Sequence, residues 1–81
     1  LQPGVSETLL PLALLYRDTK QYGLAIKRFD ELAASYEAAG KTTDALDIRL
    51  REASVLVSAR RRPEAIAIYE RVLNADANNA E

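Results

Sequence analysis

The sequence repeats itself at a fixed spacing, and this repeat is the strongest constraint on the fold. Two sets of alanines mark that spacing, Ala13, Ala33 and Ala53, and Ala25, Ala45 and Ala65. We call it the alanine repeat. Each alanine of the second set precedes a large aliphatic residue, namely Ile26, Leu46 and Ile66. Two repeated segments together make one larger unit, as from Ala25 to Ala65. Repetition on this scale is typical of proteins built from stacked copies of one supersecondary unit.

The repeated segments have the pattern of helices. Apolar residues recur at three- and four-residue spacing and never alternate over a long stretch, which favours helices over strands. We expect four helices, at about 9–18, 21–39, 42–60 and 63–75.

Helix boundaries are indicated by proline, glycine and threonine. With Thr8 as N-cap, Pro11 falls in the first turn of the first helix, where its missing N–H has no partner to lose. Gly40 suits the left-handed position that ends the second helix. We expect Thr42 or Thr43 to cap the third helix. The fourth helix is expected to open at a proline, residue 63.

The predicted fold is all-α. Alanine lets two helix backbones approach closely, and the bulky residue that follows fills a groove of the neighbouring helix. We therefore expect a right-handed α-solenoid of two stacked antiparallel hairpins. One hairpin cannot bury both of its faces, so we expect the chain to be a fragment of a longer array.

Two stretches carry a family motif. They read Leu9-x2-Leu12-Ala13-x2-Tyr16 followed by Ala25-x3-Phe29, and Ala53-x2-Leu56 followed by Ala65-x3-Tyr69. They resemble the tetratricopeptide repeat (TPR) family, whose pattern is W-x2-L-G-x2-Y, then A-x3-F, then P. The length of the two-helix unit resembles that of the longer-repeat members of the family. The chain departs from the family at Arg49 and Glu52, where the family is usually apolar.

The resemblance implies one TPR-like domain over residues 1–81. Its first unit is expected at about 6–40 and its second at about 42–76. Residues 77–81 are expected to form a joint toward a further repeat, because Asp76-Ala77-Asn78-Asn79-Ala80-Glu81 is similar to the turn that links hairpins in the family. We also expect Ile68 and Val72, or their neighbours, to be packed by another chain or left as an exposed apolar patch.

The composition excludes several classes of function. The chain has no cysteine and no histidine, which removes disulfides, thiolate metal sites and the commonest general base. The formal net charge of −1 offers no basic field for nucleic acid. No apolar run reaches the roughly 18 residues of a membrane span, and no signal peptide is visible. We expect a cytoplasmic protein, with no cofactor, no metal and no membrane contact from this segment.

Three other groups of residues were weighed as sites. Asp44, Asp47 and Glu52 are candidates for acid–base work or cation binding, but we interpret them as a solvated face with an Asp47–Arg51 pair. The run 60–62 is a candidate anion contact, but we interpret it as a solvated turn at a helix C-terminus. We interpret the four tyrosines and Phe29 as inter-helix packing and not as a ligand cage.

The resemblance implies a partner site. In the family, the first helix of each hairpin lines a concave groove for a peptide. The matching residues are Leu10, Leu14, Arg17, Asp18, Leu50, Ser54, Val57 and Ser58. Leucines at positions 10 and 14 stand where a carboxylate-binding groove would need polar residues, so an apolar or amphipathic peptide is expected.

These observations predict a non-catalytic protein–protein interaction scaffold. Two alternatives stay open. The chain could be a self-assembly module, as a dimer or a domain-swapped array, because two hairpins are fewer than the three repeats such arrays usually need. It could also be an accessory domain of a larger enzyme or regulator.

Overall fold

The structure is a computed structural model that describes the backbone of residues 5–79 and the side chains of residues 8–75. Over that range the chain is all-helical, with no strand. The four helices are α1 (Val5–Asp18), α2 (Tyr22–Ala38), α3 (Thr42–Ser58) and α4 (Arg62–Asn79). Helices α2, α3 and α4 begin at positions 22, 42 and 62, so the alanine repeat of the sequence is the repeat of the helices.

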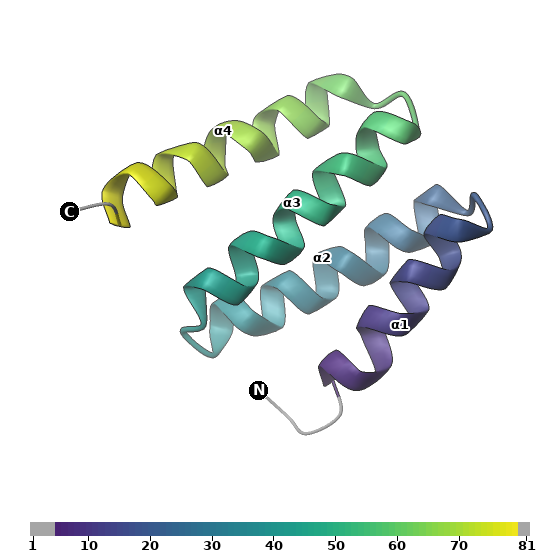
Figure 1. Cartoon of the computed structure of the whole chain (residues 1–81), viewed down its shortest axis with the longest axis horizontal. Coiled ribbons are helices and arrows are strands. Elements are labelled where there is room, and N and C mark those ends of the chain that lie inside the picture. Colours follow the sequence, from purple (N-terminus) through teal and green to yellow (C-terminus); the bar gives the residue numbers. More distant parts are fainter. Residues whose placement is uncertain (1–4, 80–81) are drawn as a thin grey trace.

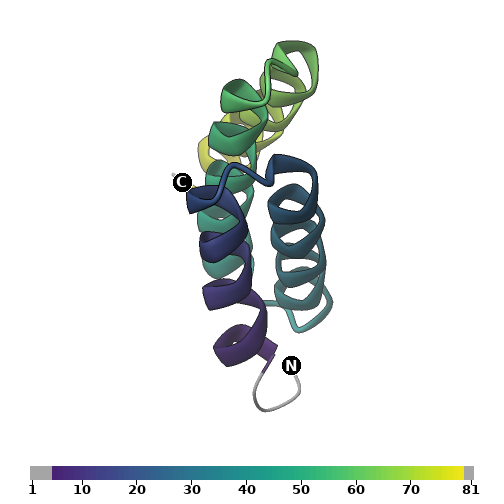
Figure 2. The ribbon, with the colours of Figure 1, turned by 90° about the vertical axis from the view of Figure 1, so that its right-hand side faces the viewer.

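Each helix packs on the next one along the chain, α1 on α2, α2 on α3 and α3 on α4. Consecutive helices run in opposite directions, and α1 and α3 lie in front of α2 (Figure 1). Figure 2 shows the same arrangement from the side, with α1 and α3 on one side and α2 on the other. The molecule measures 40 × 33 × 14 Å along its principal axes. Its thickness is that of two helix layers, since packed helix axes lie about 8–10 Å apart and each backbone adds a radius of about 2.3 Å.

Three joints of identical geometry connect the helices. In each joint, the N–H of the last residue bonds back to a carbonyl five residues earlier, from Gln21 to Tyr16 at 2.7 Å, from Lys41 to Tyr36 at 2.9 Å and from Arg61 to Leu56 at 2.8 Å. The residue before it bonds to a carbonyl three residues earlier at 3.0–3.1 Å. This pair of bonds is the Schellman motif that ends helices. The carbonyl of the same last residue then accepts the first bond of the next helix, so three residues turn the chain around.

The middle residue of each joint has a left-handed backbone. These residues are Lys20, Gly40 and Arg60, with φ of 63°, 74° and 63°. Gly40 confirms the predicted cap. Lysine and arginine at the other two joints were not expected there, because a side chain makes the left-handed region costly by about 1–2 kcal/mol. The three-residue joint requires that conformation whichever residue occupies it.

The core lies where α1, α2 and α3 meet. Phe29, Leu32 and Ala33 of α2 are fully buried there, together with Ala13 of α1, while Val55 of α3 keeps only 2% exposure. The repeated alanines 13, 33, 53, 25, 45 and 65 are all buried, which agrees with their predicted role at close helix contacts. A smaller cluster joins α3 to α4 through Ala53, Leu56 and Ala65.

The aromatic residues mostly pack as predicted. Phe29 is buried, and Tyr16, Tyr22 and Tyr36 lie against the main cluster. Tyr69 on α4 is the exception, with 36% of its surface exposed. It occupies the place in the second hairpin that Phe29 has in the first, but no helix among the described residues covers it.

The start of α1 differs from the prediction. Helix α1 begins at Val5, so Pro11 lies inside it and not in its first turn. Our expected N-cap, Thr8, is therefore a helical residue. The proline ring faces solvent, while Leu9 and Leu10 in the same turn pack against the main cluster. Tertiary packing thus outweighs the local preference of proline for a helix start.

The starts and ends of α3 and α4 also differ in detail. Thr42 is the first residue of α3, the N-cap Lys41 makes no side-chain cap bond, and α4 begins one residue before Pro63. Helix α4 continues to Asn79, so the backbone of 76–79 is helical where we expected a turn. Ala77 stands where the family has proline, and alanine does nothing to stop a helix. Residues 80 and 81 of the expected joint lie outside the described residues.

On the outer face of α4, the expected exposed apolar patch is formed by the neighbours of Ile68 and Val72 and not by these two residues. Val72 is buried and Ile68 packs against the smaller cluster. The exposed apolar residues of α4 are their neighbours Ile66, Tyr69 and Leu73.

The left-handed joint predicts that replacing two different glycines by alanine changes stability in opposite directions. A Cβ at Gly23 or at Gly40 meets no atom within 4 Å, so packing does not distinguish the two sites. We expect Gly40→Ala to lower the free energy of unfolding by about 1 kcal/mol, because its φ is positive. We expect Gly23→Ala, inside α2, to raise it by about 0.5–1 kcal/mol. Lys20→Gly is expected to stabilise like Gly23→Ala. Urea unfolding followed by circular dichroism measures all three, and equal effects at Gly23 and Gly40 would contradict the joint geometry.

Candidate functional site

The predicted groove residues of α1 divide into two kinds. Leu10 and Leu14 are half-buried and pack against the main cluster, so they serve the core of this molecule as well as any outer surface. Arg17 and Asp18 are exposed at the end of α1 and pair with each other, with 3.0 Å between Arg17 Nη2 and Asp18 Oδ1. This ion pair between exposed side chains contributes little to stability.

The predicted groove residues of α3 are all exposed. Leu50, Ser54, Val57 and Ser58 follow one another at steps of four, three and one, so they share one face of the helix. We call these four residues the α3 strip. Leu50 is 41% exposed and Val57 is 42% exposed. The strip is exposed because α3 turns Ala53, Val55 and Leu56 toward the other helices.

A cavity lies at the C-terminal end of the α3 strip. It has a volume of about 520 Å³ and is lined by Val57, Ser58, Arg60 and Arg62. Arg61 between them turns to Glu64, with 2.7 Å between Nη2 and Oε2. This contact raises the pKa of Arg61 and lowers the pKa of Glu64, chiefly through the hydrogen bond between them. Arg60 and Arg62 have no ion pair with any described residue, so two cationic groups border the α3 strip.

Sequence reasoning missed a charged cluster between α2 and α3. Arg49 of α3 binds three carboxylates, and only 12% of its side chain is exposed. Its Nη1 lies 2.6 Å from Asp30 Oδ1 and 2.9 Å from Glu52 Oε1, and its Nη2 lies 3.0 Å from Glu37 Oε1. Burial works against the charge of Arg49, but the hydrogen bonds to Glu37, Asp30 and Glu52 outweigh it and raise the pKa of the guanidinium. The signal was present in the sequence as the two departures from the apolar pattern, Arg49 and Glu52.

Glu52 is the least exposed member of that cluster. Only 6% of its side chain is exposed. Its counterparts in the alanine repeat are Leu32 and Val72, which are buried apolar residues. Burial raises the pKa of Glu52 despite the opposing hydrogen bond and charge of Arg49. The negative charge of Asp30 raises it further, and the positive charge of Arg71 on α4 lowers it.

A second cavity opens between α3 and α4. The two helices diverge from their joint (Figure 1), and toward the far end they leave a volume of about 440 Å³. Its walls include Leu46 and Arg49 of α3, Ile68 and Val72 of α4, and Glu37 of α2. Arg49 takes the place that Phe29 has in α2, but its guanidinium is held by carboxylates of α2. As a result, Leu46 is the only large apolar residue of α3 that lines this space.

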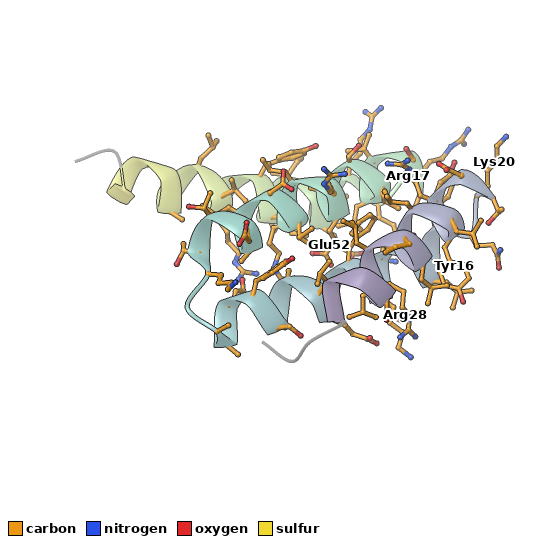
Figure 3. The ribbon with its side chains drawn as sticks, turned by 60° about the horizontal axis from the view of Figure 1, so that its bottom comes forward. Tyr16, Arg17, Lys20, Arg28 and Glu52 are labelled. Carbon is orange, nitrogen blue, oxygen red and sulfur yellow. The ribbon has the colours of Figure 1, made fainter. Side chains whose placement is uncertain are left out.

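The candidates for chemistry do not come together. Asp44 and Asp47 are exposed, whereas Glu52 is buried against Arg49. The predicted Asp47–Arg51 pair is confirmed, at 3.3 Å between Oδ2 and Nε. In Figure 3, Glu52 lies apart from Arg17, Lys20 and Arg28, the other charged side chains labelled there.

Neither a metal nor an activated hydroxyl is indicated in the described part of the chain. Its acidic residues form no group of three or more that could hold a metal ion. The hydroxyl of Ser35 donates to the backbone carbonyl of Glu31 at 3.0 Å, which fixes it in the helix. None of the helices within residues 5–79 is both long enough and apolar enough to cross a membrane.

Searches of known protein families, of curated proteins and of solved structures found no protein that matches this chain.

Removing Arg49 alone should cost more than removing Arg49 and Glu52 together. Arg49→Met leaves the Glu52 carboxylate buried without its cation, and we expect the free energy of unfolding to fall by about 3 kcal/mol. Glu52→Leu restores the apolar residue of the repeat and leaves Arg49 paired to α2. We therefore expect a change of less than about 1 kcal/mol. The double variant should lie close to wild type, as measured by urea unfolding. Additive effects of the two substitutions would contradict a direct coupling between these residues.

The raised pKa of Glu52 predicts a pH dependence. A carboxyl whose pKa is higher in the folded state binds its proton more tightly there, so its contribution to stability is lost as pH rises through that pKa. Glu52→Gln has no such titration. We expect wild type to lose unfolding free energy relative to Glu52→Gln as the pH rises above 4.5, the ordinary pKa of a glutamate. The comparison cancels the other carboxylates, and a difference that stays constant above that pH would contradict the shift.

Proposed function

We propose that this chain is a non-catalytic protein–protein interaction module that binds an amphipathic peptide along the α3 strip. We further propose that its two hairpins, α1–α2 and α3–α4, are repeats of an α-solenoid of the TPR kind. The observation that carries the proposal is the pair of exposed apolar residues Leu50 and Val57 on a helix that otherwise turns its apolar residues inward.

The position of the strip agrees with what the family resemblance implies. In that family the first helices of successive hairpins line the peptide groove, and in this chain those helices are α1 and α3. Both lie on the same side of the molecule (Figure 2). Of the predicted groove residues, those of α3 carry the proposal because their side chains are exposed. Leu10 and Leu14 of α1 already pack against the core, so only a part of each side chain is left for contact with a peptide.

The apolar contacts alone are too weak for a specific complex. Burying an aliphatic side chain fully is worth about 1.5–3 kcal/mol. Leu50 and Val57 have about two fifths of their surface left to bury, so each offers roughly 1 kcal/mol. Micromolar affinity corresponds to about 8 kcal/mol. The partner must therefore use polar contacts as well.

Arg60 and Arg62 can supply those contacts. They border the cavity next to Val57 and have no ion pair with any described residue. Guanidinium groups bind carboxylates through two parallel hydrogen bonds, which adds both energy and orientation. The partner that fits this surface is a peptide with apolar residues that cover Leu50 and Val57 and with an acidic residue at its end near Arg60.

A catalytic role has little support from the residues present. The chain has neither histidine nor cysteine, and the serines of the α3 strip lack the adjacent base that activates a hydroxyl. The buried carboxylate, Glu52, is engaged by Arg49 and lies on the far side of α3 from the strip. A role as an accessory part of a larger enzyme would use the same peptide-binding surface.

Peptide selection on the purified chain tests the proposal. A displayed library of short random peptides should yield peptides with apolar and acidic residues, and fluorescence anisotropy then measures the affinity of a synthetic copy. We expect Leu50→Asp and Val57→Asp to weaken binding at least tenfold, because each places a carboxylate in the apolar contact. The variant Arg60→Gln/Arg62→Gln should also weaken it, and more strongly at low salt than at high salt.

Leu24→Asp is the matched control. Leu24 lies on α2, outside the strip, and is 41% exposed like Leu50, so its replacement changes charge and exposed surface by the same amount. It should bind selected peptides as wild type does. Selection of no peptide, or equal losses in Leu50→Asp and Leu24→Asp, would overturn the α3 strip as the binding surface. Leu14→Asp is not a suitable test, because Leu14 packs in the core and its loss would disturb the fold.

A further inference from the structure

Helix α4 carries an exposed apolar stripe that the peptide site does not use. The stripe consists of Ile66, Tyr69 and Leu73, with exposures of 54%, 36% and 67%. These residues are three and four positions apart, so they lie on one face of the helix. Leu73 is the most exposed large apolar residue in the part of the chain where side chains are described. We call this face the α4 stripe.

The alanine repeat shows what this face does in the other helices. The matching residues of α2 are Ile26, Phe29 and Ala33. Phe29 and Ala33 are fully buried, and Ile26 packs against both core clusters. The matching residues of α3 are Leu46, Arg49 and Ala53, of which Ala53 is fully buried.

On α2 this face therefore lies in the protein core, and on α3 its alanine is buried against neighbouring helices. Its residues on α2 lie in the main cluster with residues of α1 and α3, and Ile26 also packs against the smaller cluster formed by α3 and α4. No described helix follows α4 to cover the α4 stripe in the same way.

Helix α1 carries the counterpart of the other side of this contact, which is the face by which α3 packs on α2. On α3, Val55 lies in the main cluster with Phe29 and Leu32 of α2 and is only 2% exposed. Leu15 of α1 stands at the matching place in the first hairpin, yet it is 56% exposed. The face that α3 presents to α2 thus has a counterpart on α1, marked by Leu15, that no described helix covers. We call it the Leu15 face.

We propose that the α4 stripe of one copy binds the Leu15 face of α1 in a second copy, head to tail, in the way that α2 binds α3. The two faces match because α4 is the second-hairpin counterpart of α2, and α1 is the first-hairpin counterpart of α3. The helix-on-helix contact that the fold makes internally is repeated between copies. A symmetric contact between two α4 helices has no such precedent within the molecule.

The contact between copies is more apolar than the internal one. Within the molecule, α2 and α3 are joined by the ion pair of Asp30 with Arg49. The counterpart of Arg49 on α1 is Leu9, and the counterpart of Glu52 is Leu12. No ion pair links the matching positions, so the association depends on apolar burial and changes little with salt.

A head-to-tail contact joins different surfaces and so does not close with two copies. Each copy that binds leaves one free α4 stripe at one end and one free Leu15 face at the other. The mean mass of the particles therefore rises steadily with concentration and does not stop at a dimer.

Two variants that each block one face test the proposal. Leu73→Glu places a charge in the α4 stripe, and Leu15→Glu places one in the opposite face. Sedimentation velocity from micromolar to submillimolar concentration should show growing particles for the wild-type chain and a monomer for each variant alone. An equimolar mixture of the variants should form a 1:1 dimer, because each retains the face that the other lacks. Leu24→Glu, at a leucine outside both faces, should associate like wild type.

Each alternative result overturns the proposal. A wild-type chain that is monomeric at the highest concentration leaves no association to explain. Self-association that persists in Leu15→Glu and is lost in Leu73→Glu indicates a symmetric α4 contact. A mixture in which both variants stay monomeric shows that the two faces do not bind each other. Circular dichroism confirms that the variants keep the helicity of wild type, as expected from the exposure of both leucines. None of these outcomes bears on the α3 strip.

Discussion

The three-residue joint with a left-handed residue at its centre is the constraint on which this structure depends. Its two backward hydrogen bonds end one helix, and the carbonyl of its last residue begins the next. Because the joint recurs at Lys20, Gly40 and Arg60, every helix after the first starts at the same position of the alanine repeat. Side chains at matching positions of the alanine repeat then occupy equivalent places, and a small set of alanines can form each helix contact in turn. Two of the three joints adopt this backbone without glycine. Their left-handed residues are locally unfavourable, but they keep the helix starts in register with the alanine repeat.

The equivalence of the helices is broken at one place. Arg49 and Glu52 stand where the repeat offers Phe29 and Leu32, and they bring charge into a contact that is otherwise apolar. Arg49 is held by carboxylates of α2, which ties α3 to α2 through polar contacts. Arg49 also lines the cavity between α3 and α4, where Leu46 is the only large apolar residue that α3 contributes. A smaller cluster joins those two helices nearer their joint.

The sequence predicted the fold class, the number of helices and the repeat, because these follow from periodicity and from the placement of small residues. The family resemblance pointed to four residues of α3 as a partner surface, and only the structure shows that all four are exposed. The sequence did not predict the start of α1, where packing of Leu9 and Leu10 keeps a proline within the helix. It also failed at Tyr69, because an aromatic residue at a core position of the pattern is buried only if a helix lies over it.

The sequence by itself determined the helices, their similar length and the face of each that carries the alanines, since these are local properties of backbone and side-chain spacing. Tertiary structure alone decided what each face meets. The α3 strip and the α4 stripe both carry large apolar residues at helical spacing, and spacing does not distinguish them. The first is exposed because α3 turns it away from both neighbours, and the second because no described helix follows α4. The partners of Arg49 were likewise decided in three dimensions, since Asp30 and Glu37 belong to another helix and reach it only when α2 and α3 pack.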